Sequence, residues 1–209
     1  MKPKVTNILI VGVGGQGVVL AGEIIAAVAL EAGLDVKKSE VHGMAQRGGV
    51  VSSHVRYGEK VHSPIIKRGA VDILLSFEEF ETLRWLNYLA PEAQIIMNLQ
   101  RLAPPSLALG KHQYPENTVE LLQKKGYTPL AFDALLEATT LGNPRLVNIL
   151  LLGVLSCLLD LKVESWKRII AEKVPSKWKD LNLAAFTRGR DLCNELTKKG
   201  LAASQKSSQ

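Results

Sequence analysis

The sequence contains very few cysteines. Only Cys157 and Cys193 are present among 209 residues, and they stand far apart in the chain. Zinc sites and iron–sulfur clusters require several thiolates or imidazoles at short, characteristic spacings. We therefore expect this chain to hold no metal site, and the two thiols to be ordinary buried or half-buried side chains.

Long apolar runs and aromatic residues are also scarce. The most apolar segment, Leu146–Leu161, is interrupted by Asn148, Ser156 and Asp160, so it is too short to span a bilayer and is expected to be a core or interface helix. The N-terminal residues MKPKVTN lead into a strand pattern without the apolar region of a signal peptide. These features predict a cytoplasmic protein with no membrane partner.

The net charge of +6 is concentrated in the C-terminal third, where residues 162–209 hold 11 Lys and Arg against 5 Asp and Glu. A basic face can meet nucleic acid, an acidic protein or only water. Aromatic residues make up just 5% of the chain, and no nucleic-acid motif accompanies the lysines. We expect no nucleic-acid partner.

The clearest motif is a cluster of glycines near the N-terminus. A continuous apolar run at 8–11, typical of a buried parallel strand, precedes it, and helical apolar spacing over 18–32 follows. The spacing G-x-G-x-x-G suits a tight strand-to-helix turn, and the amides at the helix start attract phosphate. A tight turn without a ligand is the alternative. The candidate ligand-binding residues are Gly12, Gly14, Gly15, Gln16 and Gly17.

The next strand argues against a tightly bound nicotinamide cofactor. Such folds place an acid about 20 residues beyond the glycines to hold the ribose hydroxyls. Lys37 and Lys38 stand there instead, and Glu40 is a late candidate. The lysines either meet an extra phosphate or are solvated residues of a strand, the interpretation we favour. A free-standing dinucleotide-dependent dehydrogenase remains an alternative function.

Strand and helix patterns alternate along the first 133 residues. They predict the α/β class, a Rossmann-like doubly wound, mainly parallel sheet with an inserted β-hairpin and a helical C-terminal part. One domain is expected over 1–200, with its α/β core over 1–133, its helical part over 134–200, and a flexible tail at 201–209. The predicted strands are 35–41, 70–77, 93–99 and 128–132, the hairpin is 51–57 with 60–66, and the helices are 78–89, 118–125, 134–141, 143–161, 164–174 and 182–199.

A second candidate loop, HGMAQRGG, follows the strand at 35–41. This position places it near the carboxyl edge of the sheet, where ligands of open α/β folds bind. An imidazole, an amide and a guanidinium on a glycine-rich backbone can hold a carboxylate or phosphate, although an incidental flexible loop is the alternative. No acid or nucleophile accompanies them, so we expect no catalytic residue in this chain. The candidate residues are His42, Gly43, Met44, Gln46, Arg47, Gly48 and Gly49.

Taken together, four segments resemble a known family. VGVGGQGVVLAGEI, HGMAQRGGVVSSHVRYG, SPIIKRGAVDILLSFEEFETLR and VPSKWKDLNLAAFTRGRDL are similar to the beta subunits of indolepyruvate:ferredoxin oxidoreductases. More broadly they resemble the gamma-type subunit or domain of the 2-oxoacid:ferredoxin oxidoreductases. The resemblance covers nearly the whole chain, and the pairing of the glycine turn with HGMAQRGG is its most specific part.

The resemblance implies a partner-dependent enzyme that oxidatively decarboxylates a 2-oxo acid to an acyl-coenzyme A and reduces ferredoxin. Thiamine diphosphate and iron–sulfur clusters are expected in a large alpha subunit, aryl pyruvates such as indolepyruvate are the expected substrates, and coenzyme A is the co-substrate. The isolated chain is expected to bind no cofactor tightly and to be inactive, with a homodimer as its possible state in isolation. Alternatives are a gamma subunit of a pyruvate, branched-chain or 2-oxoglutarate enzyme, and a nucleotide-sensing scaffold.

Overall fold

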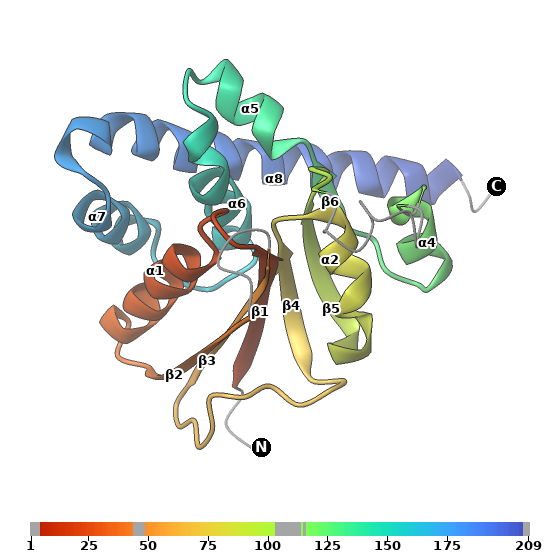
Figure 1. Ribbon diagram of the computed structural model, residues 1–209, viewed down its shortest axis with the longest axis horizontal. Helices are drawn as coiled ribbons and strands as arrows, with labels where there is room; N and C mark the ends of the chain where they lie inside the picture. The colour runs from red at the N-terminus through yellow and green to blue at the C-terminus, as the bar shows by residue number, and fades with distance from the viewer. Residues whose placement is uncertain (1–4, 44–48, 103–113, 115, 207–209) are drawn as a thin grey trace.

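The computed structural model describes residues 5–43, 49–102, 114 and 116–206. Within them, a six-stranded sheet has the order β2-β3-β1-β4-β5-β6 (Figure 1). Strands β1, β4, β5 and β6 are parallel, and β3 runs antiparallel between β1 and β2. The predicted Rossmann-like, mainly parallel α/β fold is confirmed. The strands are β1 (Thr6–Val13), β2 (Asp35–His42), β3 (Val50–Gly58), β4 (Val71–Ser76), β5 (Leu89–Asn98) and β6 (Leu130–Phe132).

The antiparallel partners differ from those predicted. Strand β3 pairs on both sides, with β1 and β2, and residues 60–66 form no strand. Side chains bind the backbone of this segment instead: Val61 N donates to Asp35 Oδ2 (2.8 Å), and Ser63 O accepts from Arg56 Nη1 (2.7 Å). The predicted pairing of 51–57 with 60–66 is therefore wrong, because these side-chain contacts replace the ladder that the apolar pattern indicated.

Helices cover both faces of the sheet (Figure 1). One hydrophobic core joins the sheet to α1, α5, α6, α7 and α8, and a second joins its other face to the α2 region and α4. Short 3-10 helices lie at Leu86–Tyr88, Pro144–Leu146 and Ser176–Trp178. The α-helices are α1 (Val18–Glu31), α2 (Glu79–Arg84), α4 (Thr118–Lys124), α5 (Ala134–Thr140), α6 (Val147–Ser156), α7 (Val163–Lys173) and α8 (Lys179–Lys206).

Several predicted element boundaries need correction. The helix expected over 143–161 is a 3-10 turn followed by α6, which ends at Ser156. The helix expected over 78–89 ends at Arg84, and β5 begins at Leu89, before Pro91. Helix α8 continues through much of the expected tail, to Lys206, and 207–209 lie outside the described residues. The division of the chain into a single domain with two parts remains a prediction.

The apolar segment near Leu146 forms part of the core. Every residue of α6 is buried, mainly against α8 and the sheet. Gly153 of α6 and Gly189 of α8 lie at the crossing, where an added Cβ on either residue would come within 3 Å of the other's Cα. Across the part of the chain that the structure describes, no helix is long and apolar enough to cross a membrane.

The connections of β1 and β4 create a crevice at one edge of the sheet. Helix α1, which follows β1, packs on one face, whereas α2, which follows β4, packs on the other. Because β1 and β4 are adjacent and parallel, their carboxyl ends form a topological switch point. Ligands of open α/β folds bind at such a point.

Candidate functional site

The glycine turn lies at the carboxyl end of β1, at this switch point. A Cβ on Gly12 would come within 2.8 Å of Phe77 Cβ and 2.9 Å of Val18 Cγ2, so a larger residue does not fit there. Gly15 and Gly17 have φ values of 99° and 89°, which L side chains rarely adopt. Glycine is therefore required at Gly12 by packing and at the other two positions by backbone conformation.

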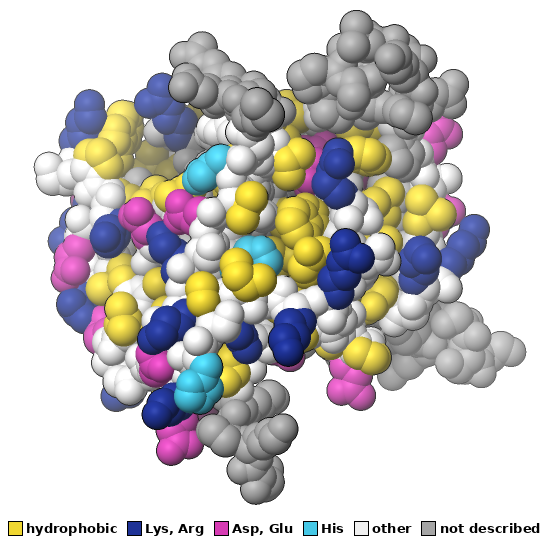
Figure 2. All heavy atoms as spheres, turned by 60° about the horizontal axis from the view of Figure 1, so that its bottom comes forward, with side chains coloured by type: hydrophobic (Ala, Val, Ile, Leu, Met, Phe, Trp, Pro, Cys, Tyr) yellow, Lys and Arg dark blue, Asp and Glu magenta, His cyan; other side chains and the backbone are white. Residues whose placement is uncertain are grey.

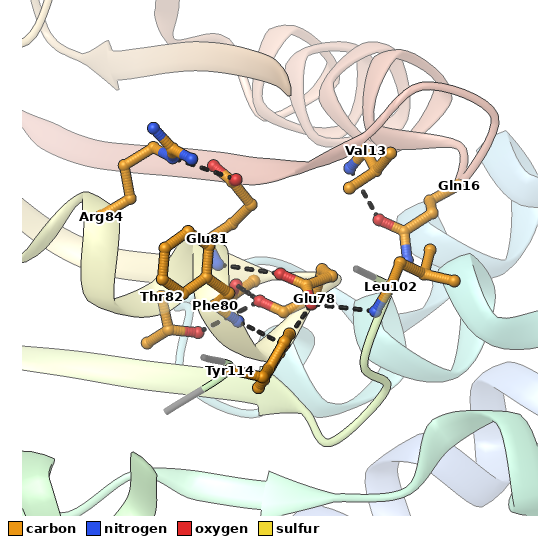
Figure 3. A network of polar contacts seen from close by, with 10 residues as sticks. Val13, Gln16, Glu78, Phe80, Glu81, Thr82, Arg84, Leu102 and Tyr114 are labelled. Carbon is orange, nitrogen blue, oxygen red and sulfur yellow. Dashed lines mark hydrogen bonds and ion pairs between the residues drawn. The ribbon is translucent and has the colours of Figure 1, made fainter. Parts of the chain in front are cut away.

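Gln16 points beneath the turn and joins the ends of three strands. Its Oε1 accepts a hydrogen bond from Val13 N (2.7 Å, Figure 3), and its Nε2 donates to Phe77 O and to Gln100 Oε1, both at 3.0 Å. These partners lie at or just after the ends of β1, β4 and β5. Gln16, predicted as a ligand-binding residue, thus has its amide group engaged in holding the switch point together.

Above the turn is a hollow of about 680 Å³. The start of α1 forms one side of it, and among the described residues the amides of Val18, Val19 and Leu20 have no hydrogen-bond acceptor. Free amides at a helix start attract anions, whereas the carboxylate of Glu23 opposes them. The lining residues are Val13, Gly14, Gly15, Gly17, Val18, Val19, Leu20, Glu23, His42, Gly43 and Val51.

The beginning of the second predicted loop borders the same hollow. His42 is the last residue of β2, with Nε2 3.5 Å from Glu40 Oε2, and Gly43 N donates to Val50 O (2.8 Å). On the far side of the loop, Gly49 O accepts from Gly14 N at 2.9 Å, which ties the two motifs together.

The predicted site residues fall into three groups. Those that meet at the hollow are Gly14, Gly15, Gly17, His42 and Gly43. Those that serve the framework are Gly12, Gln16 and Gly49. Those outside the described residues are Met44, Gln46, Arg47 and Gly48.

The two lysines of β2 have acidic partners on their own strand. Lys37 Nζ lies 2.7 Å from Asp35 Oδ1, and Lys38 Nζ lies 2.7 Å from Glu40 Oε1. Neither lysine lines the hollow. This arrangement supports the interpretation of the lysines as solvated strand residues over a role in binding an extra phosphate.

Sequence reasoning missed a cluster of buried carboxylates directly after β4. Glu78, only 1% exposed, accepts hydrogen bonds from Glu81 N (2.9 Å), Leu102 N (3.1 Å) and the Tyr114 hydroxyl (Figure 3). Tyr114 Oη in turn accepts from Phe80 N at 2.9 Å. The available signal was the stretch SFEEFE, which places three glutamates at the end of a buried strand.

The other two glutamates of this cluster are paired with arginine. Glu79 binds Arg101 through two hydrogen bonds of 2.7 and 3.2 Å, and Glu81 Oε1 accepts from Arg84 Nε at 3.1 Å. Burial raises the pKa of the Glu81 carboxyl, and Glu81 Oε2 has no hydrogen-bond partner among the described residues. None of the three glutamates lines the hollow. The contacts of Glu78 with Leu102 and of Glu79 with Arg101 anchor the segment after β5 to the start of α2.

The donor set of the chain does not suit an iron–sulfur cluster. The only cysteines, Cys157 and Cys193, lie at the end of α6 and on α8. Among the described residues, no group of three or more His, Cys, Asp or Glu side chains is placed to hold a metal ion.

The fold and the glycine turn at the switch point define a Rossmann-like α/β protein whose crevice suits an anionic ligand. A family model described as pyruvate ferredoxin/flavodoxin oxidoreductase matches residues 7–192. The chain belongs to this family. The predicted resemblance is confirmed, as is the predicted function as a subunit of a ferredoxin-dependent 2-oxoacid oxidoreductase.

Individual relatives agree with this membership. The chain is 38% identical over 200 residues to the indolepyruvate oxidoreductase subunit IorB of Thermococcus kodakarensis, covering 92% of this chain and 98% of the relative. A keto/oxoacid ferredoxin oxidoreductase gamma subunit from Geobacter sulfurreducens has a TM-score of 0.68 at 23% identity, covering 91% of this chain and 99% of that subunit.

A larger enzyme contains the same fold. The 2-oxoglutarate:ferredoxin oxidoreductase of Magnetococcus marinus, solved with 2-oxoglutarate, coenzyme A and succinyl-CoA, has a TM-score of 0.72 at 21% identity. The match covers 92% of this chain and 31% of that one. In that enzyme, therefore, this fold occurs within a much longer chain.

Proposed function

We propose that the chain is the non-thiamine subunit of an indolepyruvate:ferredoxin oxidoreductase. In this proposal a large alpha subunit oxidatively decarboxylates indolepyruvate and other aryl pyruvates to aryl-acetyl-CoA and passes the electrons to ferredoxin. The observation that carries the proposal is the 38% identity to an IorB subunit over nearly the full length of both chains. A cytoplasmic location goes with it as a prediction.

The partner is proposed to supply the cofactors. Two separated cysteines cannot ligate a cluster that requires four ligands. Thiamine diphosphate, when bound in the alpha subunit, would supply the carbanion chemistry of decarboxylation. The residues of this chain would bind and orient coenzyme A or the 2-oxo acid at the boundary with the alpha subunit.

The hollow at the glycine turn is proposed to receive the phosphates of coenzyme A. Val18, Val19 and Leu20 at the start of α1 line it, and their amides have no acceptor among the described residues; anions bind at such helix starts. Coenzyme A is one of the ligands named for the structurally similar Magnetococcus enzyme. Arg47 is proposed to add a cation from the second loop.

Exposed apolar surface supports a subunit contact. Figure 2 shows hydrophobic side chains in the middle of one face, with Lys and Arg side chains nearby. An apolar centre with a polar rim is typical of protein interfaces. Over the whole surface of the described residues, the large hydrophobic side chains that remain exposed are Leu30, Val41, Ile65, Leu99, Leu102, Leu121, Leu135, Leu136 and Trp178.

Co-expression with a candidate large subunit tests the proposal. The purified pair should reduce a dye anaerobically with indolepyruvate and phenylpyruvate, dependent on coenzyme A, and more slowly with pyruvate, 2-oxoglutarate or branched-chain 2-oxo acids. A preference for one of the latter would reassign the substrate. Nicotinamide-dependent turnover by this chain alone would favour a dehydrogenase, and assembly without any effect on turnover would favour a scaffold.

A charge placed in the hollow tests the coenzyme A site. Val19→Asp adds a carboxylate beside the free amides, at a helix start where the helix dipole favours an acid and where the partly buried Val19 side chain packs against the core. Leu30→Asp, at the exposed far end of the same helix, is the matched control. We expect the KM for coenzyme A to rise about ten-fold or more in Val19→Asp alone, with the KM for the 2-oxo acid unchanged. Equal kinetics in the two variants would remove coenzyme A from this hollow.

A further inference from the structure

The crossing of α6 and α8 brings two helix backbones into direct contact. A Cβ on Gly153 would lie 2.3 Å from Phe186 O, and one on Gly189 would lie 2.2 Å from Leu150 O. No side chain separates the helices there. The distance between the next turns of the two helices is consequently fixed by the backbones.

The two cysteines of the chain occupy those next turns. Cys157 follows Gly153 by four residues, and Cys193 follows Gly189 by four residues. Cys157 Sγ lies 3.8 Å from Arg190 O, so it reaches across to α8 one turn before Cys193. Both cysteines are free thiols. Cys157 Sγ also lies 3.8 Å from Gly153 O, and the two thiols are close enough to shift each other's pKa.

The two thiols differ in accessibility and acidity. Cys157 is half-buried, whereas Cys193 is only 4% exposed. The neighbouring Cys193 thiol lowers the pKa of Cys157 to about 7, against burial, which raises it, and with help from the Arg190 guanidinium. The same contact raises the pKa of Cys193. Because Cys157 is the more accessible of the two, we assign it as the attacking thiol and the sheltered Cys193 as the resolving thiol.

We propose that Cys157 and Cys193 are a peroxide-reactive pair that closes to a disulfide between α6 and α8. The Cys157 thiolate attacks one oxygen of a hydroperoxide, the O–O bond breaks, and a sulfenic acid forms. The Cys193 thiol then attacks that sulfur, and the hydroxyl leaves as water. With hydrogen peroxide the sum is two thiols and one peroxide giving one disulfide and two waters.

The disulfide would link two of the helices that cover one face of the sheet. It closes a loop of about 36 residues, and cross-links of that length stabilise a folded chain mainly by restricting the unfolded one. We expect the Tm of the oxidised chain to exceed that of the reduced chain by roughly 5–15 °C. Neither cysteine lines the hollow at the glycine turn, so the pair is separate from the proposed coenzyme A site.

The test treats the full chain with excess hydrogen peroxide and then counts free thiols with maleimide, using mass spectrometry of peptides. Cys157→Ser and Cys193→Ala are the matched variants, and dimedone traps sulfenic acid. In the parent, both thiols should disappear together within one chain, independently of protein concentration, and dithiothreitol should restore both. Dimedone should label Cys157 in Cys193→Ala, and Cys193 should stay reduced in Cys157→Ser.

Three results would overturn the proposal. They are oxidation of Cys157 in the parent to a sulfinic acid while Cys193 stays reduced, a disulfide that forms only between chains, and survival of both thiols in peroxide. The parent and Cys157→Ser decide the matter even where Cys193→Ala does not fold, because serine at the half-buried position 157 keeps a hydrogen-bond donor for Gly153 O and Arg190 O.

Discussion

Gly153→Ala sets two physical effects against each other. Within a helix, alanine is favoured over glycine by about 1 kcal/mol, so helix propensity alone predicts a more stable protein. At the α6–α8 crossing, the new methyl group would lie 2.3 Å from Phe186 O and 2.8 Å from Gly189 Cα. Both of these atoms belong to backbone, which cannot move aside as a flexible side chain does.

The geometry sets the size of the effect. Carbon atoms in normal contact lie about 3.5–4.0 Å apart, so the helices must separate by roughly 1 Å. Overpacking of this kind costs about 1–3 kcal/mol or more, and α6 is buried along its whole length. Because both opposing atoms are backbone, we take the upper value of about 3 kcal/mol; subtracting about 1 kcal/mol of helix propensity leaves a net loss of about 2 kcal/mol, which lowers the Tm by roughly 4–8 °C in a chain of this size.

Thermal unfolding followed by circular dichroism measures the effect. Gly142→Ala is the control, because its Cβ would meet nothing within 4 Å and the substitution strains only a backbone with φ of 94°. Its Tm should fall less than that of Gly153→Ala. A Gly153→Ala variant as stable as the parent, or more so, would refute the direct helix contact on which the thiol-pair argument also depends.

Three further substitutions test the polar framework. Gln16→Ala removes the hydrogen bonds that join the ends of β1, β4 and β5. The free energy of unfolding, measured in urea, should fall by about 1–3 kcal/mol. An unchanged free energy of unfolding would contradict the structural role of Gln16. Tyr114→Phe removes a hydrogen-bond donor from the buried Glu78 carboxylate and should lower the free energy of unfolding by about 1–3 kcal/mol. A smaller decrease would contradict the network of Figure 3. Burial raises the folded-state pKa of Glu81, so the folded chain binds this proton more tightly than the unfolded chain does. The stability of the parent relative to Glu81→Gln should therefore increase as the pH falls from 8 towards 4.5, and a difference independent of pH would contradict the raised pKa.

The sequence predicted elements whose signals are local. The run at 8–11, the glycines and the helical spacing after them correctly place β1, the turn and α1, because backbone preferences act over a few residues. The partner of β3 could not be predicted in this way. A strand that follows β2 can pair with its neighbour or insert between two others, and long-range contacts such as Asp35 with Val61 decide the outcome.

The candidate site also combines features that have a local sequence signal with features that depend on distant residues. The glycine spacing predicted a turn with free helix amides, which the structure contains. Spacing could not reveal that Gln16 points under the turn, since its orientation depends on Phe77 and Gln100, more than 60 residues away in sequence. The glutamates after β4 carried a readable signal, but their burial depends on Tyr114 and Arg101 from a later segment.

The central claim is that this chain completes an indolepyruvate-oxidising enzyme. The most direct measurement adds the separately purified chain, in increasing amounts, to a candidate large subunit under anaerobic conditions and follows coenzyme A-dependent dye reduction by indolepyruvate. We predict no activity from this chain alone, and a rise in activity that saturates at a fixed ratio of the two chains. Full activity of the large subunit without this chain, or no activity at any ratio that forms a stable complex, would contradict the account.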